Sequence, residues 1–394
     1  MKVVVAQPNK QYCNDLLLAL QQKGYLEQFY TLLATNKIGG WSKKLPAQFR
    51  NELKKRTYPG IAADRITHFP SILLYHKFFT KDMVHRIQTS YKQYDLAVAK
   101  KLESKDYDII IAYENSNLHT FQQAKKQGKI TVLDLAQVHH EKIAQINKWV
   151  TLEKGVDEAK MRYMNEQKGA ALKYTDYVLT LSSFARDSMI EYGFPAEHVF
   201  TANLGINPDL FQAKKDWPQN ERFRFLFVGT MTYRKGINLL LQAFDELKLP
   251  NVELILIGPM ADAEDLMKQY EGLYTYIPFT HQEELVRHYQ AADVFVFPSY
   301  LDSWAQTVVE AMACGTPAIV TEHTGAKDVV ARGGGFVIPP NNLEALKALI
   351  IEVVNDKERV KMMGRRAALI AQEYTWNRYH ARIQEIVEEI GSRS

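Results

Sequence analysis

Cysteine is scarce in this chain of 394 residues, because Cys13 and Cys314 are its only two thiols and lie far apart in the sequence. Two isolated cysteines exclude a disulfide scaffold and a cysteine-rich metal site, and they favour a cytoplasmic location. The sequence also has no apolar run of about 18 residues, which excludes a transmembrane helix. Met1 leads at once into the short apolar run Lys2–Ala6, which predicts a first strand rather than a signal peptide.

Acidic residues are rare in the first quarter of the chain. Residues 1–100 contain 16 Lys and Arg but 6 Asp and Glu, whereas residues 201–394 contain 20 and 25. The stretch from about 37 to 75 carries much of this positive charge and interrupts the strand pattern, so we interpret it as a basic insertion. Peripheral contact with the inner face of a membrane is one interpretation, and a solvated lysine surface is the other. We expect no nucleic-acid partner, because motifs for stacking bases are missing.

Short β-rich runs alternate with helical runs along the whole chain, which is typical of α/β folds with parallel strands. The predicted strands of the first half are Lys2–Pro8, Gln28–Thr35, Asp108–Tyr113, Ile130–Ala136, Asp176–Ser182 and His198–Leu204. Those of the second half are Phe223–Gly229, Val252–Gly258, Tyr274–Phe279, Asp293–Pro298, Pro317–Thr321 and Gly335–Ile338. Nearly continuous apolar strands indicate helices on both sheet faces.

Turn-forming residues are concentrated between Gly205 and Asn220, where the alternation stops and starts again. We therefore predict two Rossmann-like domains, residues 1–205 and 206–375, which face each other across a cleft. In open parallel sheets, ligands bind beyond the carboxyl ends of the strands. Side chains that follow strand ends are therefore the candidates for a functional site.

Two cations follow the first strand of the second half. Gly229 ends this strand and permits a close backbone approach, and Arg234 and Lys235 come shortly afterwards. A guanidinium fork beside an ammonium group suits a diphosphate. An exposed basic pair in a surface loop is the alternative interpretation.

Two acids flank the start of a later predicted helix. The strand 293–298 is followed by a loop with Asp302, and the helix that begins near Thr307 carries Glu310 about one turn inside. The amide groups of a helix N-terminus attract an anion, and Thr307 can cap or donate there. Carboxylates at these positions could accept hydrogen bonds from sugar and ribose hydroxyls. Two acids at this spacing are by themselves a weak signal.

Several segments in a fixed order resemble a known family. "FVGTMTYRKGINLLLQAF", "ADVFVFPSYLDSWAQTVVEAMACGTPAIVT" and "GGGFVIPP" are similar to the C-terminal domain of the retaining glycosyltransferases of family 4, which have the GT-B fold. The resemblance spans about residues 176–375. It implies two Rossmann-like domains across a cleft and a C-terminal helix, residues 376–394, that packs back on the N-terminal, acceptor-binding domain.

The resemblance also implies a role for each matching residue. In the E-x7-E motif of this family the first acid contacts the transferred sugar and the second contacts the ribose, which here are Asp302 and Glu310. Arg234 and Lys235 match the cations that stabilise the departing diphosphate. Further donor contacts are expected at Gly229, Pro278, Ser299, Trp304, Gln306 and Thr307.

This chain departs from the family pattern in the same loop. The family usually has Glu at Asp302, Gly-Phe-Gly at Ser303-Trp304-Ala305 and often Leu at Gln306. Aspartate is shorter by one methylene group, and the lost glycines restrict close backbone approach to phosphate. We expect these changes to affect which donor sugar is used more than the fold.

Many family members place a histidine beyond a strand of the first domain, near the transferred sugar. Here His139 and His140 follow the predicted strand 130–136, and either could serve. A structural role is the alternative for both. The stretch Glu114–Asn117 follows another strand, so we expect it to line the acceptor cleft.

Asp106-Tyr-Asp108 has the D-x-D spacing of metal-dependent glycosyltransferases, but it precedes its strand and so belongs to the wrong end of the sheet. We expect no catalytic metal and no cofactor besides the nucleotide diphosphate sugar itself.

The sequence thus predicts a retaining, metal-independent glycosyltransferase that moves a sugar from a nucleotide diphosphate sugar to a hydroxyl of a glycan, lipid-linked or small-molecule acceptor. Two alternatives stay open: a sugar-nucleotide epimerase of the same fold, and a non-catalytic sugar-nucleotide-binding protein.

Overall fold

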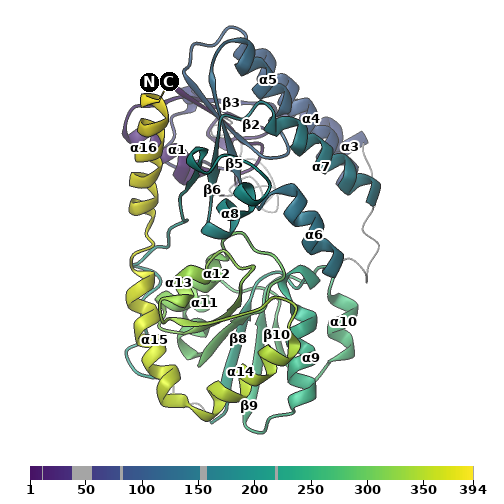
Figure 1. Cartoon of the computed structure of the whole chain (residues 1–394), viewed down its shortest axis with the longest axis vertical. Helices are drawn as coiled ribbons and strands as arrows, with labels where there is room; N and C mark the ends of the chain where they lie inside the picture. Colours follow the sequence, from purple (N-terminus) through teal and green to yellow (C-terminus); the bar gives the residue numbers. More distant parts are fainter. Residues whose placement is uncertain (11, 38–55, 80–82, 151–157, 218–220, 394) are drawn as a thin grey trace, which may run out of the picture.

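The computed structural model describes residues 1–10, 12–37, 56–79, 83–150, 158–217 and 221–393. Two helix-covered parallel sheets lie one above the other, the first at the top of Figure 1 and the second below it. The predicted pair of Rossmann-like units is confirmed. Within the described residues, no helix is both long and apolar enough to cross a membrane.

The first sheet has the strand order β3-β2-β1-β4-β5-β6-β7. Its strands are β1 (Val3–Ala6), β2 (Leu26–Thr31), β3 (Ile66–His68), β4 (Ile109–Tyr113), β5 (Ile130–Leu135), β6 (Tyr177–Thr180) and β7 (Val199–Thr201). The accompanying helices are α1 (Cys13–Gln22), α3 (Pro70–Phe79), α4 (Met83–Leu102), α5 (Leu118–Lys126), α6 (His140–Val150), α7 (Glu158–Leu172) and α8 (Ser183–Glu191).

The second sheet has the order β10-β9-β8-β11-β12-β13. Its strands are β8 (Phe223–Val228), β9 (Val252–Ile257), β10 (Thr275–Ile277), β11 (Val294–Phe297), β12 (Ala318–Thr321) and β13 (Gly335–Ile338). Its helices are α9 (Ile237–Leu247), α10 (Glu264–Gln269), α11 (Gln282–Ala291), α12 (Gln306–Ala313), α13 (Lys327–Ala331), α14 (Leu343–Asn355) and α15 (Lys357–Ala371), and α16 (Trp376–Ser392) ends the chain.

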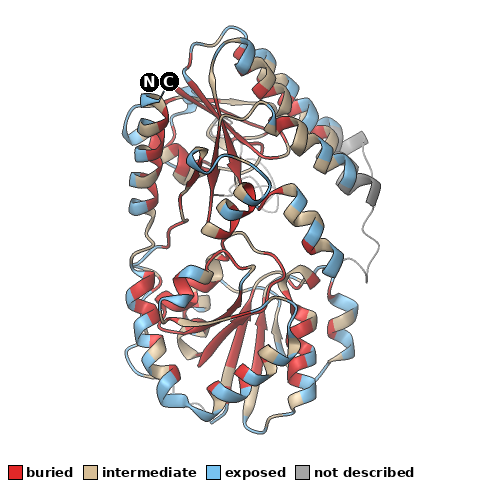
Figure 2. Ribbon diagram, viewed as in Figure 1, coloured by how far each residue is buried: buried red, intermediate tan, exposed pale blue. Residues whose placement is uncertain are grey.

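Apolar strands explain why each sheet is covered on both faces. Every residue of β4 and of β11 is buried, and the strands are the red centre of each unit in Figure 2. Burial of apolar surface on both faces of a strand requires a helix layer on each side. Strand order reverses between β1 and β4 in the first sheet and between β8 and β11 in the second. Ligands of doubly wound sheets bind at such switch points.

The predicted insertion at 37–75 lies partly inside the first sheet. Ile66–His68 forms the edge strand β3, which pairs with Phe29–Thr31 of β2, and residues 70–79 form α3. A three-residue strand is too short to show a period in the sequence, which is why the alternation did not reveal it. Residues 38–55, on which the expected membrane contact mainly depends, lie outside the described part of the chain.

The chain crosses between the two units twice, and the crossings touch. The Ile206 amide donates to the Tyr374 carbonyl at 2.8 Å, and Ile206 pairs with Thr375 as an isolated bridge. A Cβ atom added to Gly205 would lie 2.1 Å from the backbone nitrogen of Trp376. The crossings are therefore held together by direct backbone contact.

Helix α16 returns to the first unit, as predicted, and packs along α1 on the left of Figure 1. The His380 ring lies 3.1 Å from an Asp15 carboxylate oxygen, and Gln384 donates to the Ala19 carbonyl at 2.9 Å. Both chain termini meet at this end of the molecule. The C-terminal helix thus fastens the second unit to the first.

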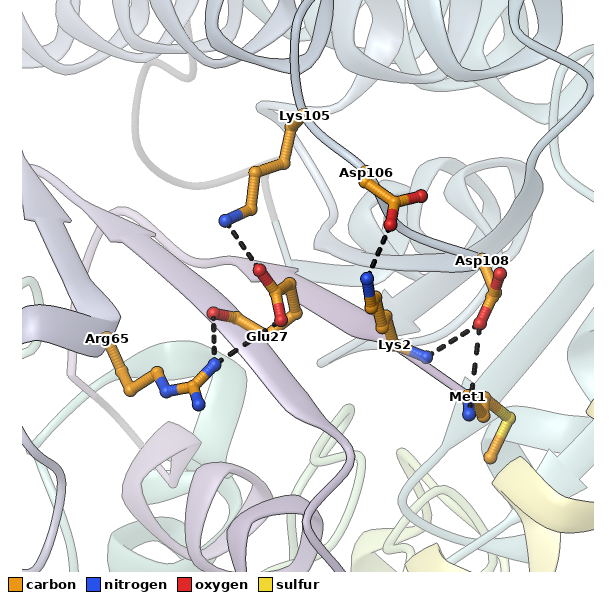
Figure 3. Close-up of polar contacts among 7 residues, drawn as sticks. All are labelled: Met1, Lys2, Glu27, Arg65, Lys105, Asp106 and Asp108. Atoms are coloured by element: carbon orange, nitrogen blue, oxygen red, sulfur yellow. Dashed lines mark hydrogen bonds and ion pairs between the residues drawn. The ribbon is translucent and has the colours of Figure 1, made fainter.

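Asp106 and Asp108, the two acids of the D-x-D spacing, lie at the amino edge of the first sheet. Figure 3 shows Lys2 paired with Asp106 through its side chain and with Asp108 through its backbone amide, at 2.7 Å. Lys105 pairs with Glu27 at 2.7 Å on the neighbouring strand. These acids therefore hold strand ends together, on the edge opposite to the one where ligands bind.

We predict that Gly205→Ala lowers the free energy of unfolding by about 1–3 kcal/mol, because its methyl carbon forces the two crossings apart. Urea unfolding followed by circular dichroism measures this change. Gly24→Ala is the control, since a Cβ atom there meets nothing within 4 Å and the substitution costs only its positive φ. Equal losses in the two variants would contradict a tight crossing.

Candidate active site

Two loops meet at the switch point of the second sheet. The Gly229 loop, residues 229–236, leaves β8, and the Asp302 loop, residues 298–305, leaves the adjacent strand β11. Gly236 has φ +76°, and a Cβ atom there would lie 2.0 Å from the Pro298 carbonyl oxygen. Only glycine permits both this conformation and this approach, so Gly236 brings the two loops into contact.

Arg234 connects the two loops by hydrogen bonds. Its carbonyl accepts from the Tyr300 amide at 2.9 Å and from the Ser299 hydroxyl at 3.2 Å. Its guanidinium donates to the Leu301 carbonyl at 2.5 Å. Ser299 is fully buried, so its hydroxyl serves this loop contact in the structure.

Lys235 lies directly over the end of β8. Its Nζ would be 2.9 Å from a Cβ atom on Gly229, and it lies 5.5 Å from the centre of the Phe297 ring. Burial lowers the pKa of Lys235, and the nearby Asp302 carboxylate partly offsets that effect. An ammonium group at a strand end with little water around it is well placed to attract an anion.

The Asp302 carboxylate organises its own loop. One of its oxygens accepts from the backbone amides of Trp304 at 3.2 Å and of Ala305 at 2.7 Å. Ala305 precedes α12 with φ +62°, a left-handed conformation that glycine adopts more readily. Asp302 therefore compensates, by two hydrogen bonds, for the alanine at a position where glycine was the expected residue.

Trp304 and Gln306 join the Asp302 loop to the interdomain crossings. The Trp304 indole donates to the Gln306 side-chain oxygen at 3.0 Å, and the Gln306 amide donates to the Gly205 carbonyl at 2.8 Å. The Trp304 ring also lies 5.7 Å from that of Tyr374. Both side chains, which were predicted to contact the donor, therefore bind to the interdomain crossings in the structure.

Glu310 lies one turn inside α12, as the sequence predicted. It is partly buried and accepts a hydrogen bond from the Tyr289 hydroxyl at 3.0 Å. Burial raises the pKa of its carboxyl to about 7. Thr307, also partly buried, lies in the first turn of the same helix.

Pro278 lies farther from this centre, beyond the end of the edge strand β10 and two strands from β8. It is exposed, and the Phe279 ring beside it is 71% exposed. Phe279 was predicted to be the last residue of a strand and no role in the site was predicted for it, whereas β10 ends at Ile277 and leaves this ring beyond the strand. A flat, exposed ring at the carboxyl edge can stack on a ligand.

His139 and His140 belong to the first unit, where the chain passes from β5 into α6. The His139 ring stacks on the Tyr192 ring, with 4.7 Å between their centres, and lies 4.2 Å from the centre of the His140 ring. Burial lowers the pKa of His139 to about 4. Both histidines line a cavity whose described walls come entirely from the first unit. Their predicted roles at the transferred sugar stay predictions.

Other residues make the contact between the two units. The Ser303 hydroxyl donates to the Ala136 carbonyl at 2.5 Å, just beyond the end of β5. The ring of His323 stacks between Trp149 at 5.5 Å and Phe184 at 5.2 Å. The carboxyl edges of the two sheets therefore face each other. Sequence spacing held no signal for these pairs.

Among the residues that the structure describes, no three His, Cys, Asp or Glu side chains form a group that could hold a metal ion.

Comparison with known proteins bears on the second unit most directly. Residues 210–369 match the model of the family "Glycosyl transferases group 1". The chain is 28% identical over 235 residues to O-antigen chain mannosyltransferase B of Escherichia coli, covering 55% of this chain and 61% of that protein. It is 25% identical over 262 residues to the amylovoran biosynthesis glycosyltransferase AmsK of Erwinia amylovora, covering 62% and 64%. The matches therefore span less than two thirds of either relative.

Solved structures extend the similarity of fold to the whole chain. Sucrose-phosphate synthase from Thermosynechococcus elongatus superposes with a TM-score of 0.70 at 18% identity and covers 100% of both chains. HepE of Anabaena, in complex with UDP-glucose, superposes with a TM-score of 0.67 at 17% identity and covers 99% of this chain and 100% of that one. The predicted resemblance to family 4 and the GT-B fold is confirmed, since residues 210–369 match the group 1 glycosyl transferase family and the fold of the whole chain matches solved GT-B structures.

Proposed function

We propose that this protein transfers a sugar, with retention of configuration, from a nucleotide diphosphate sugar to a hydroxyl of a glycan acceptor. One observation carries the proposal: the Lys235 ammonium lies over Gly229 at the switch point of the second sheet, with Arg234 and Asp302 on the same pair of loops. This is where a doubly wound sheet receives a nucleotide.

The main barrier to transfer is the negative charge that develops on the departing diphosphate. Lys235 stabilises this charge directly, and the first-turn amides of α12 add a partial positive charge. Arg234 contributes by exchanging its bond to the Leu301 carbonyl for one to a phosphate oxygen. The bond from the anomeric carbon to the diphosphate breaks as the acceptor oxygen bonds to the same face. The acceptor proton passes to a diphosphate oxygen, so no metal is needed.

Glu310 and Asp302 hold the two sugars of the donor. Glu310 accepts from the ribose hydroxyls once it is ionised, and its position one turn inside α12 suits this role. The Asp302 carboxylate, which already organises its loop, faces Lys235 and accepts from the transferred sugar. Phe279 offers its exposed ring to the base.

The similar proteins support one class of donor and one class of acceptor. One solved neighbour, HepE of Anabaena, contains UDP-glucose, which supports a uridine nucleotide as donor. The curated relative from Escherichia coli is named for an O-antigen chain, which supports a growing glycan as acceptor. A lipid-linked glycan would account for the excess of Lys and Arg in residues 1–100.

We predict that Lys235→Met lowers turnover of the nucleotide sugar by about 100-fold, because the departing diphosphate loses a buried positive charge. A panel of nucleotide sugars is first scored by thermal shift, and release of the nucleoside diphosphate from the best ligand is then measured. Lys268→Met is the matched control, since Lys268 is exposed on α10.

Analysis of the product distinguishes the proposed transferase from a sugar-nucleotide epimerase and from a non-catalytic binding protein. NMR of a transferase product shows the donor's anomeric configuration, whereas an epimerase releases an isomerised sugar. Donor binding without any turnover would identify a non-catalytic binding protein. Wild-type turnover in the folded Lys235→Met variant would refute the assigned site.

We also predict that Glu310 makes nucleotide binding depend on pH. Burial raises the pKa of this carboxyl to about 7, so the group is protonated below that pH and accepts ribose hydrogen bonds fully only above it. Nucleotide affinity should therefore rise about tenfold relative to Glu310→Gln between pH 6 and 8. Calorimetry gives the two Kd values, and their ratio cancels the titration of the phosphates. A ratio that does not change with pH would contradict the role.

A further inference from the structure

The ring of His323 belongs to the second unit but lies between two aromatic rings of the first. Trp149 comes from α6, which extends toward the second unit in Figure 1, and Phe184 comes from the first turn of α8. The three rings are nearly parallel, since the His323 plane is inclined by 6° to that of Trp149 and by 15° to that of Phe184. Stacked aromatic rings attract each other beyond the area that they bury. The first unit therefore fixes the plane of the His323 ring.

The same ring is bonded to the Asp302 loop. Its Nδ1 atom lies 3.1 Å from the Tyr300 carbonyl oxygen, and because a carbonyl only accepts, the Nδ1–H group donates. Burial lowers the pKa of His323, so the ring is neutral near pH 7 and its one N–H proton is used in this bond. A hydrogen bond from a planar ring depends on the direction of the ring plane. The two rings of the first unit therefore set the direction of a bond to the Asp302 loop.

The backbone around His323 pairs with the same loop. The His323 carbonyl accepts from the Asp302 amide at 3.1 Å, and the Gly325 amide donates to the Asp302 carbonyl at 2.7 Å. Asp302 and Thr324 form an isolated parallel bridge. A Cβ atom on Gly325 would lie 1.9 Å from the Ser303 carbonyl oxygen, so the two segments are in close contact. A shift of His323 would therefore move Asp302 with it.

The two sides of the stack differ in their exposure. Phe184 is 6% exposed, and the Lys327 ammonium lies 5.7 Å from the centre of its ring. Next to it the Ser183 hydroxyl donates to the Asp328 carboxylate of the second unit. Trp149 is 43% exposed, so its ring can be removed without leaving a cavity in the core.

We propose that His323 is a positioning residue, which aligns the Asp302 carboxylate with the transferred sugar while Trp149 and Phe184 of the first unit hold its ring. The role rests on the proposed function, in which Asp302 binds the transferred sugar. Other residues, Lys235 and Glu310, hold the nucleotide there. Loss of the stack should therefore slow the transfer of the sugar and leave nucleotide binding intact.

Substitutions can separate the two contacts of the His323 side chain. His323→Phe keeps a ring in the stack but loses the donor to the Tyr300 carbonyl. His323→Asn keeps a donor near the place of Nδ1 but loses the ring. Trp149→Ala removes the stacking partner in the first unit, and Trp149→Phe restores a ring there. Leu96→Ala on α4 is the matched control, because Leu96 is an apolar side chain of the first unit with a similar exposure of 47%.

Hydrogen exchange of the full chain without any ligand, followed by mass spectrometry, reports how firmly residues 300–305 are held. Exchange there should be about fivefold faster in Trp149→Ala and in both His323 variants, because each variant breaks one link between the first unit and the loop. Exchange should be unchanged in Trp149→Phe and in Leu96→Ala. Wild-type exchange in Trp149→Ala would overturn the proposed link.

Turnover and nucleotide binding are then compared in the same variants. The kcat for the nucleotide sugar with the largest thermal shift should fall about tenfold in Trp149→Ala and in both His323 variants. Thermal shifts with UDP, GDP and ADP should stay as in the wild type. Unchanged turnover would show that the ring only joins the two units, and weaker nucleotide binding would show that the whole donor site is loosened, so either result would overturn the positioning role.

The two measurements also distinguish this inference from the proposed function. A wild-type protein that turns over no nucleotide sugar would refute the proposed function, and with it the role of Asp302 at the sugar. The exchange rates of residues 300–305 need no donor, so they decide separately whether Trp149 holds the loop through His323.

Discussion

Gly205 and the backbone of Trp376 lie too close together for Gly205 to carry a side chain. This contact holds the two crossings of the chain together, and the relative position of the two units depends on it. Helix α16 can then reach α1, and the carboxyl edges of the two sheets face each other. Gln306 adds a link, because its amide joins the Gly205 carbonyl to the Trp304 indole. The position of the Asp302 loop is therefore tied to the relative position of the two units.

The switch points of the two units carry different kinds of side chain. In the second sheet, glycines let two loops touch and set a partly desolvated lysine over the strand ends, which suits a charged diphosphate. In the first sheet, the residues after β4 are amides, a hydroxyl and a compensated ion pair. Parallel strands direct both sets toward the same gap, since all their carboxyl ends point one way. Charge is thus concentrated on the side where we propose that the leaving group forms.

How far the sequence could predict this structure depended on the range of each interaction. Long apolar strands, the loop of Arg234 and Lys235 and the helix of Glu310 could be placed in the fold because each depends on neighbours along the chain. The edge strand β3 was missed because three residues carry no period. The histidines were assigned from their place after β5, where the structure indeed has them at the start of α6, and their contact with the donor stays a prediction. The bond between Ser303 and Ala136 joins residues 167 positions apart, and no local pattern encodes it.

The departures of the Asp302 loop from its family pattern share one consequence. A serine where glycine is usual supplies the hydroxyl that reaches Ala136, and an aromatic ring at 304 packs toward Tyr374. Glutamine where leucine is common supplies the amide that reaches Gly205. Alanine at 305 adopts a strained φ, and the Asp302 carboxylate offsets that cost with two backbone hydrogen bonds. A loop with glycine at 303 and 305 would bind phosphate more freely but would lack the serine hydroxyl that reaches Ala136. In this protein the loop has less backbone freedom but makes contacts that set the distance between the two units, so domain geometry explains its composition before any preference for a particular sugar is invoked.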